Sequence, residues 1–303
     1  MQMSLGKLKK MIPWWAKIGA KIIFSRLNFN YSFWKRIQLF EHGDMNDPHR
    51  AYDIFVLHAR AAGMLDESLP PYLKFRCGGG AVLELGPGDS LFSGVIAKFL
   101  GATHSWMVDA GAFATRDGNA YARLAKYLID MGYAGSFVDG DFDRMLTDCQ
   151  ITYLTNGAAC LSEIPDDSVD FCFSNAVLEH VPKNDFKEMV RQLRRILKPD
   201  GVCVHRVDLK DHLGGALNNL RFSETVWESA FFSNSGFYTN RIRFSEMLDM
   251  FRWAGFSCIT SHVVQWDTLP IRRSLLAQPF RDLPDNELRV SGFDVVLRPM
   301  GDQ

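Results

Sequence analysis

Short apolar runs alternate with helical periods from residue 81 to residue 297, and this alternation predicts a parallel sheet covered by helices on both faces. Five apolar runs are predicted to be buried parallel strands, at residues 81–85, 105–109, 151–155, 169–174 and 202–208. Two later runs, residues 257–264 and 293–297, predict an antiparallel pair that closes the sheet. The expected fold is therefore α/β, with a seven-stranded, mostly parallel sheet.

The segments between these strands carry helical spacing. Helices are predicted around residues 90–100, 121–131, 185–197 and 245–254. The third is the clearest, because its apolar side chains fall on one face: Phe186, Met189, Val190, Leu193, Ile196 and Leu197. We expect two regions, a helical amino-terminal region over residues 1–75 and a main domain over residues 76–303.

Residues 213–240 interrupt the regular alternation. The segment begins near the pair Gly214 and Gly215 and is rich in aromatic side chains. Glycine pairs act as hinges in segments that close over active sites. We therefore expect residues 213–240 to form a lid that shapes a substrate pocket.

The first 40 residues contain no Asp or Glu, while basic and aromatic residues alternate there. Lysines interrupt every apolar run well before the length of a membrane span, and no secretory cleavage site follows. Three roles remain open: peripheral contact with an anionic membrane surface, a cap over the main domain, or a mitochondrial presequence. The expected location is the cytoplasm, with the inner face of a membrane or the mitochondrion as alternatives.

Overall charge argues against a nucleic-acid partner. The chain has 34 Lys and Arg against 35 Asp and Glu, so no positive field surrounds it. Its six cysteines are scattered without a Cys-x-x-Cys pair, which favours buried free thiols over a structural metal site.

A glycine turn follows the first predicted strand, where ligands bind in sheets of this kind. Gly86 and Gly88 allow a tight turn, and Pro87 stiffens it. A dinucleotide-binding turn would carry a third glycine where this chain has Leu91, and Asp89 would repel a pyrophosphate.

Two acidic residues around this turn favour a cofactor without phosphate. Glu84 can hold an ammonium group, as on the methionine end of S-adenosylmethionine (SAM). Asp109 ends the second strand, 21 residues after Gly88, where a carboxylate can accept both ribose hydroxyls. SAM is therefore favoured over a nicotinamide dinucleotide.

Four segments together resemble the successive motifs of class I, Rossmann-like SAM-dependent methyltransferases: residues 82–88, 164–170, 174–181 and 193–201. The resemblance implies that SAM is the cofactor and S-adenosylhomocysteine the product. It also implies the cofactor-binding residues, which are Glu84, Gly86, Pro87, Gly88, Asp109, Ala110, Asn175, Ala176 and His180. The family often has an acidic residue for adenine after the third strand, where this chain has Asn156. Asn156 or a main-chain carbonyl is expected to take that role.

The segment after the fourth strand bears on the acceptor. Enzymes that methylate amino groups of DNA bases carry an Asn- or Asp-Pro-Pro-Tyr element there, whereas residues 175–180 resemble small-molecule O-methyltransferases. A hydroxyl acceptor benefits from a general base, and histidine suits this role near neutral pH. His180 is one candidate, with a capping or packing role as the alternative.

A second cluster lies on and after the fifth strand. We expect His212 to be a general base that Asp208 or Asp211 orients. A divalent cation on Asp208, Asp211, His212 or His180 is an alternative that we do not predict, and a purely structural loop cap is another.

The function predicted from the sequence is O-methylation of a small molecule or glycan. A loose resemblance of residues 40–60 to the region that precedes the catalytic domain in methyltransferases of bacterial glycan biosynthesis suggests the glycan. In that segment His58 either faces the substrate or packs inside its helix. The alternatives are N- or C-methylation of a small metabolite, and a catalytically silent scaffold that binds SAM.

Overall fold

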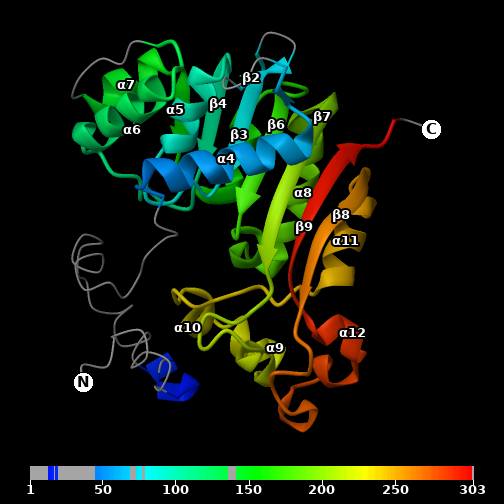
Figure 1. Ribbon diagram of the computed structural model, residues 1–303. Coiled ribbons are helices and arrows are strands. Elements are labelled where there is room, and N and C mark those ends of the chain that lie inside the picture. The colour runs from blue at the N-terminus through cyan, green and yellow to red at the C-terminus, as the bar shows by residue number, and fades with distance from the viewer. Residues whose placement is uncertain are drawn as a thin grey trace.

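A seven-stranded sheet forms the centre of the molecule (Figure 1). The computed structural model describes residues 13–16, 18–19, 45–68, 73–76, 79–135 and 141–301. Across the sheet the strands are β5 (Ile151–Leu154), β4 (His104–Val108), β3 (Ala81–Leu85), β6 (Val169–Asn175), β7 (Leu197–Asp208), β9 (Val290–Pro299) and β8 (Phe256–Gln265). The first five pair in parallel, and β9 is antiparallel to both of its neighbours. This confirms the predicted fold class.

The strand order reverses at β3. Leu85 at the end of β3 is in register with Val108 of β4 on one side and with Ser174 of β6 on the other. The chain therefore leaves the ends of β3, β4 and β6 at one edge of the sheet. In doubly wound sheets this reversal opens the crevice in which ligands bind.

Helices cover both faces of the sheet, and each face has its own core (Figure 1). One core includes residues of α4 (Pro48–Ala62), α5 (Phe92–Phe99), α6 (Gly118–Asp130) and α7 (Phe142–Asp148). The other includes residues of α8 (Lys183–Ile196) and α11 (Phe244–Trp253). Along β6 the side chains alternate between the two, with Phe171 and Phe173 in the first core and Cys172 in the second.

Helix α4 brings the region before the glycine turn onto the sheet. The Asp47 side chain caps its first turn by accepting a hydrogen bond from the Arg50 amide at 2.9 Å. Phe55 packs edge-to-face on Phe173 of β6, with ring centroids 5.6 Å apart. His58 is buried, and its Nδ1 lies 2.8 Å from the Ile54 carbonyl oxygen. His58 therefore has the packing role that was one of its two expected roles.

Short elements complete the fold. They are β1 (Leu65–Asp66), β2 (Lys74–Phe75), η2 (Gly157–Glu163), η3 (Leu178–His180), η4 (Asn218–Arg221), α9 (Glu224–Trp227), α10 (Ala230–Ser233), η5 (Arg273–Leu275), η6 (Phe280–Asp282) and α12 (Asp285–Leu288). The segment predicted as a lid contains η4, α9 and α10, and it lies beyond the ends of β6 and β7 (Figure 1).

The lid segment has a small core of its own around Trp227, which donates a hydrogen bond from Nε1 to the Thr239 carbonyl at 2.7 Å. Ile18 belongs to this core, and Trp14 meets Phe222 edge-to-face at 6.1 Å. The described part of the amino terminus thus packs on the lid. Most of the segment for which membrane contact was predicted, residues 1–40, lies outside the described residues.

The division at residue 75 also stays a prediction. Helix α4 falls in the expected amino-terminal region, although its buried face contributes to the core of the main sheet. Within the described ranges, no helix is both long and apolar enough to cross a membrane.

Candidate functional site

The turn after β3 has the shape that its glycines allow. Gly86 and Gly88 both have φ of +67°, a left-handed conformation that other residues rarely adopt. A Cβ placed on Gly86 would lie 2.5 Å from Cγ2 of Val177, in the segment after β6. The two loops at the point of strand reversal therefore touch, and only glycine fits between them.

Asp109, directly after β4, fixes the far side of the turn. Its Oδ2 accepts a hydrogen bond from the Gly88 amide at 2.8 Å, and its Oδ1 accepts one from the Ala110 amide at 2.7 Å. The Gly157 amide, in the loop after β5, donates to the Asp109 carbonyl oxygen at 2.8 Å. Asp109 thus joins the loops that follow three neighbouring strands. Asn156 is exposed at the same edge, next to Gly157.

Glu84 lies beneath the turn and is 2% exposed. Its carboxylate accepts a hydrogen bond from the Ser93 hydroxyl on α5. Burial, helped by the charge of Asp109, raises the pKa of Glu84 to about 8 against the bond from Ser93. A nearby cation would favour the ionised form.

The last residue of β6 carries an unpaired polar atom. Oδ1 of Asn175 is buried and has no hydrogen-bond partner. The next residue, Ala176, has φ of +56° and donates its amide to the Arg206 carbonyl on β7 at 2.8 Å. The glycine turn, Asp109 and Asn175 therefore lie at one edge of the sheet.

Asn240, the last residue of the segment predicted as a lid, holds this segment in place. Its Nδ2 donates to the carbonyls of Leu178 at 2.8 Å and Val181 at 2.9 Å, and its main-chain amide donates to Glu179 at 2.7 Å. His180 is tied to the same region, because its Nδ1 lies 2.9 Å from the Tyr238 carbonyl oxygen.

His180 and His212 come together from the loops after β6 and β7. Their ring centroids are 4.7 Å apart, with the planes almost perpendicular. Glu179 is the carboxylate beside them, and one ligand atom from each of the three residues lies within 4.8 Å of the others. Both histidines were predicted from the sequence, whereas Glu179 was not. Its place next to His180 in the chain was the available signal.

Asp211 serves the loop instead of orienting His212. Its two carboxylate oxygens accept hydrogen bonds from the amides of Leu213, Gly214, Gly215 and Asn218 and from Nδ2 of Asn218, at 2.6–3.1 Å. Asp208 accepts a bond from the Lys210 amide at 2.9 Å and forms an ion pair with the Lys210 ammonium at 3.3 Å. Asp211 therefore has the loop-capping role that was an alternative for this cluster.

His205 stands apart from this group. It is buried inside the sheet, where its Nδ1 lies 2.8 Å from the Ser174 hydroxyl oxygen. Burial lowers the pKa of His205 to about 3, so the ring is neutral at physiological pH.

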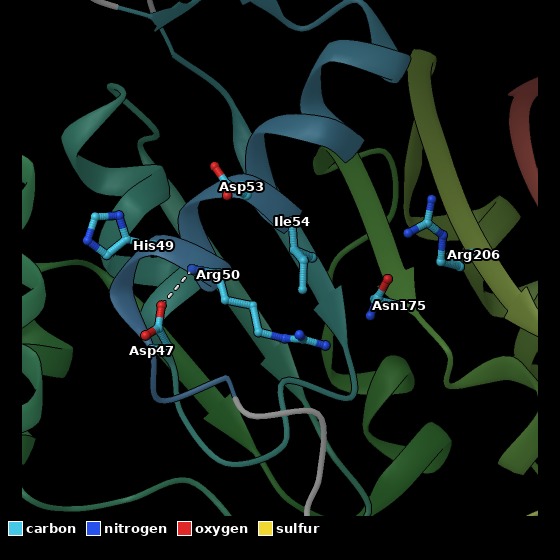
Figure 2. A pocket seen from close by; sticks show the side chains of 7 residues that line it. All are labelled: Asp47, His49, Arg50, Asp53, Ile54, Asn175 and Arg206. Atoms are coloured by element: carbon cyan, nitrogen blue, oxygen red, sulfur yellow. Dashed lines mark hydrogen bonds between the residues drawn. The ribbon is translucent and has the colours of Figure 1, made fainter.

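An open polar cavity of about 660 Å³ lies between the start of α4 and the ends of β6 and β7. Figure 2 shows the Arg50 side chain extending from α4 toward Asn175, with Arg206 on the far side. Arg206 forms two hydrogen bonds of 2.8 Å with the Asp294 carboxylate. The other lining residues are Asp47, His49, Asp53 and Ile54. Arg50 and Arg206 were not among the site residues predicted from the sequence.

Comparison with known families identifies the centre of the chain. Residues 83–205 match the sequence model of the methyltransferase-domain family, which takes in the glycine turn and the strands from β3 into β7. No curated protein shows significant sequence similarity to the chain.

Several solved methyltransferase structures are similar to the chain at low sequence identity. A SAM-dependent methyltransferase from Mesorhizobium loti is 18% identical, covers 73% of this chain and 92% of its own, and has a TM-score of 0.39. A phosphoethanolamine N-methyltransferase of Haemonchus contortus is 14% identical (84% and 54% covered, TM-score 0.44). The CurJ carbon methyltransferase is 11% identical (99% and 72% covered, TM-score 0.47).

The family match and the strand order define the class. Residues 83–205 form a methyltransferase domain, and the protein is a class I SAM-dependent methyltransferase with SAM as its cofactor. The residues at the carboxyl edge fit this cofactor, because they offer carboxylates and an unpaired amide oxygen at Asn175 to its cationic end and hydroxyls. SAM supplies an electrophilic methyl group.

The buried carboxylate of Glu84 predicts a pH-dependent gain of stability in the Glu84→Gln variant. Its pKa is about 8 in the folded protein and near 4.5 unfolded, so between these values the unfolded state releases a proton that the folded state keeps. Wild-type stability contributed by this group therefore falls as the pH rises from 5 to 8. We expect the variant to gain up to about 3 kcal/mol over wild type across that range, measured by thermal unfolding without cofactor. The exposed Glu246→Gln variant is the control, and an equally flat difference for both variants would contradict the assignment.

Asp211 gives a second prediction. Removing its carboxylate in Asp211→Ala leaves buried amides without acceptors, so we expect a loss of about 3 kcal/mol in the free energy of unfolding. Asp208→Ala, at a half-buried site, should change it by less than about 1 kcal/mol. Denaturant titration measures both. Wild-type stability of Asp211→Ala together with lost turnover would instead place Asp211 in the chemistry.

Proposed function

We propose that the protein transfers the methyl group of SAM to a hydroxyl of a small molecule or glycan. The observation that carries the proposal is the contact of His180 with His212 at the edge where β6 and β7 end, directly after the segment that borders the cofactor turn. Oxygen acceptors need a group that takes up the hydroxyl proton, and imidazole can do so near neutral pH. N- or C-methylation would depend less on such a base.

The cofactor would lie across the loops that Asp109 joins. In this proposal Glu84 neutralises the methionine ammonium, and Asp109 accepts the ribose hydroxyls. Asn156 is placed for the adenine end. The remaining contacts come from the turn and from the segment after β6, through Gly86, Pro87, Gly88, Ala110, Asn175, Ala176 and His180.

The proton acceptor would be His180 or His212. Where Nδ1 of His180 donates to the Tyr238 carbonyl, Nε2 is the basic atom of that ring. The carboxylate next to the pair is Glu179, so it replaces Asp208 and Asp211 as the residue proposed to stabilise the imidazolium that forms. The proton moves from the hydroxyl to the imidazole as the oxygen attacks the methyl carbon in line with the departing sulfur.

The polar cavity supports an acceptor with several hydroxyls. Arg50 and Arg206 offer donors, Asp47 and Asp53 offer acceptors, and Asn175 lines the same space. Such a mixed set suits the hydroxyl groups of a sugar. A cytoplasmic acceptor, presented at the inner face of a membrane, remains part of this proposal.

Replacing the two histidines tests the proposal. Of the variants His180→Asn and His212→Asn, the one that removes the base should lower turnover by roughly 10²- to 10⁴-fold, since this is the usual contribution of a general base. The affinity for S-adenosylhomocysteine should change by less than about threefold for His212→Asn, because that ring is not assigned to the cofactor. Methyl transfer from radiolabelled SAM to a panel of glycosides and small alcohols measures turnover, and calorimetry measures the affinity.

The exposed His262→Asn variant is the matched control and should keep wild-type turnover. Full turnover in both active-site variants would rule out an imidazole base. Wild-type protein that binds S-adenosylhomocysteine but methylates amines, and none of the alcohols, would show that nitrogen is the acceptor atom.

A further inference from the structure

We propose that Glu179, His180 and His212 bind a divalent transition-metal ion. One ligand atom from each residue lies within 4.8 Å of the other two, so a modest change of rotamer brings all three to one ion. The inference rests on the proposed O-methylation and changes its mechanism, because an ion held by both imidazoles would activate the acceptor hydroxyl in place of an imidazole base. It differs from the cation site considered from the sequence, whose carboxylates were Asp208 and Asp211.

The environment of Glu179 is independent evidence that a cation binds here. Glu179 is 2% exposed, and neither carboxylate oxygen makes a hydrogen bond of normal geometry. A buried carboxylate without a partner is costly, and a bound cation removes that cost.

The protein holds the ligand residues as metal sites require. Nδ1 of His180 lies 2.9 Å from the Tyr238 carbonyl oxygen, a contact that orients the ring and leaves Nε2 to coordinate. The Asn240 amide bonds to the Glu179 carbonyl at 2.7 Å, and the Asn240 side chain holds the residues on either side of this pair. His212 enters from the neighbouring loop, which Asp211 fixes through its amide hydrogen bonds.

The donor set selects the kind of ion. Two imidazoles and one carboxylate suit Zn²⁺ and other first-row divalent ions, whereas Mg²⁺ prefers oxygen ligands alone. Glu179 is buried while both histidines are exposed, so three protein ligands leave an open position toward solvent. An acceptor hydroxyl bound there would have a lowered pKa and would release its proton to water. Its oxygen would then form the new bond to the methyl carbon as the carbon–sulfur bond breaks and its electrons go to sulfur.

Metal binding can be measured without turnover. The full-length protein, stripped with a chelator and freed of it, is titrated with ZnCl₂ and with MnCl₂ by calorimetry, and bound metal is counted after dialysis. We expect one ion per chain. Glu179→Gln and His212→Ala should each weaken binding at least tenfold, since losing a ligand costs no less than losing its supporting residues. His212 is exposed, so its variant keeps the proposal testable if Glu179→Gln fails to fold.

A second cluster provides the decisive control. Cys172, Cys203 and His205 also lie close enough to share an ion, and all three are buried in the sheet. Cys203→Ser should leave the affinity unchanged, and Co²⁺-loaded protein should lack the charge-transfer absorption of thiolate ligands. Absence of stoichiometric binding, or binding that survives both site variants, would overturn the proposal.

Turnover separates this inference from the proposed function. Methylation of a hydroxyl that a chelator abolishes and Zn²⁺ or Mn²⁺ restores supports the catalytic role of the ion. Methylation that persists in chelator leaves the O-methyltransferase assignment intact and overturns the role of the ion. Metal binding in protein that methylates no hydroxyl supports the site and overturns the proposed function alone.

Discussion

The hydrogen bonds of Asp109 set the geometry on which the cofactor edge depends. Its carboxylate holds the amides of Gly88 and Ala110, and its carbonyl oxygen accepts a bond from Gly157, so one residue connects the loops after β3, β4 and β5. The left-handed glycines of the turn are held in this shape because the carboxylate receives the amide that the turn exposes. Without that anchor, the contact between Gly86 and Val177 would have no fixed distance.

A second anchor, Asn240, does the same for the acceptor side. It joins the end of the lid to the short helix η3, and thereby fixes Glu179 and His180 relative to the end of β6. The lid itself is packed around Trp227 and meets the described part of the amino terminus at Ile18. A movement of the lid would therefore displace the ring of His180, whose Nδ1 contacts the Tyr238 carbonyl oxygen.

Sequence patterns were sufficient for the fold and for the convergence of the glycine turn with Asp109. Buried strands such as β6 are apolar on both faces because helices cover both, and that pattern is local. Glu84, Gly86, Gly88 and Asp109 meet because the carboxyl ends of adjacent parallel strands share an edge, which follows from topology alone. The acceptor side depends on loop paths that no local pattern encodes. Five amide groups of one loop donate hydrogen bonds to Asp211, and the main chain around Glu179 is held by Asn240, which lies far along the sequence.

The two halves of the site share one electrostatic property. Each places a glutamate, Glu84 or Glu179, in a buried position where burial raises the pKa to about 8, and no Lys or Arg of the described residues forms an ion pair with either. Apolar residues at these two positions would often be equally or more favourable for stability. Both carboxylates instead lie where a cation is expected, the methionine ammonium in one case and a metal ion in the other. A bound cation would then favour the ionised form of each carboxyl group, and this would link binding at each half to the stability of the edge that forms it.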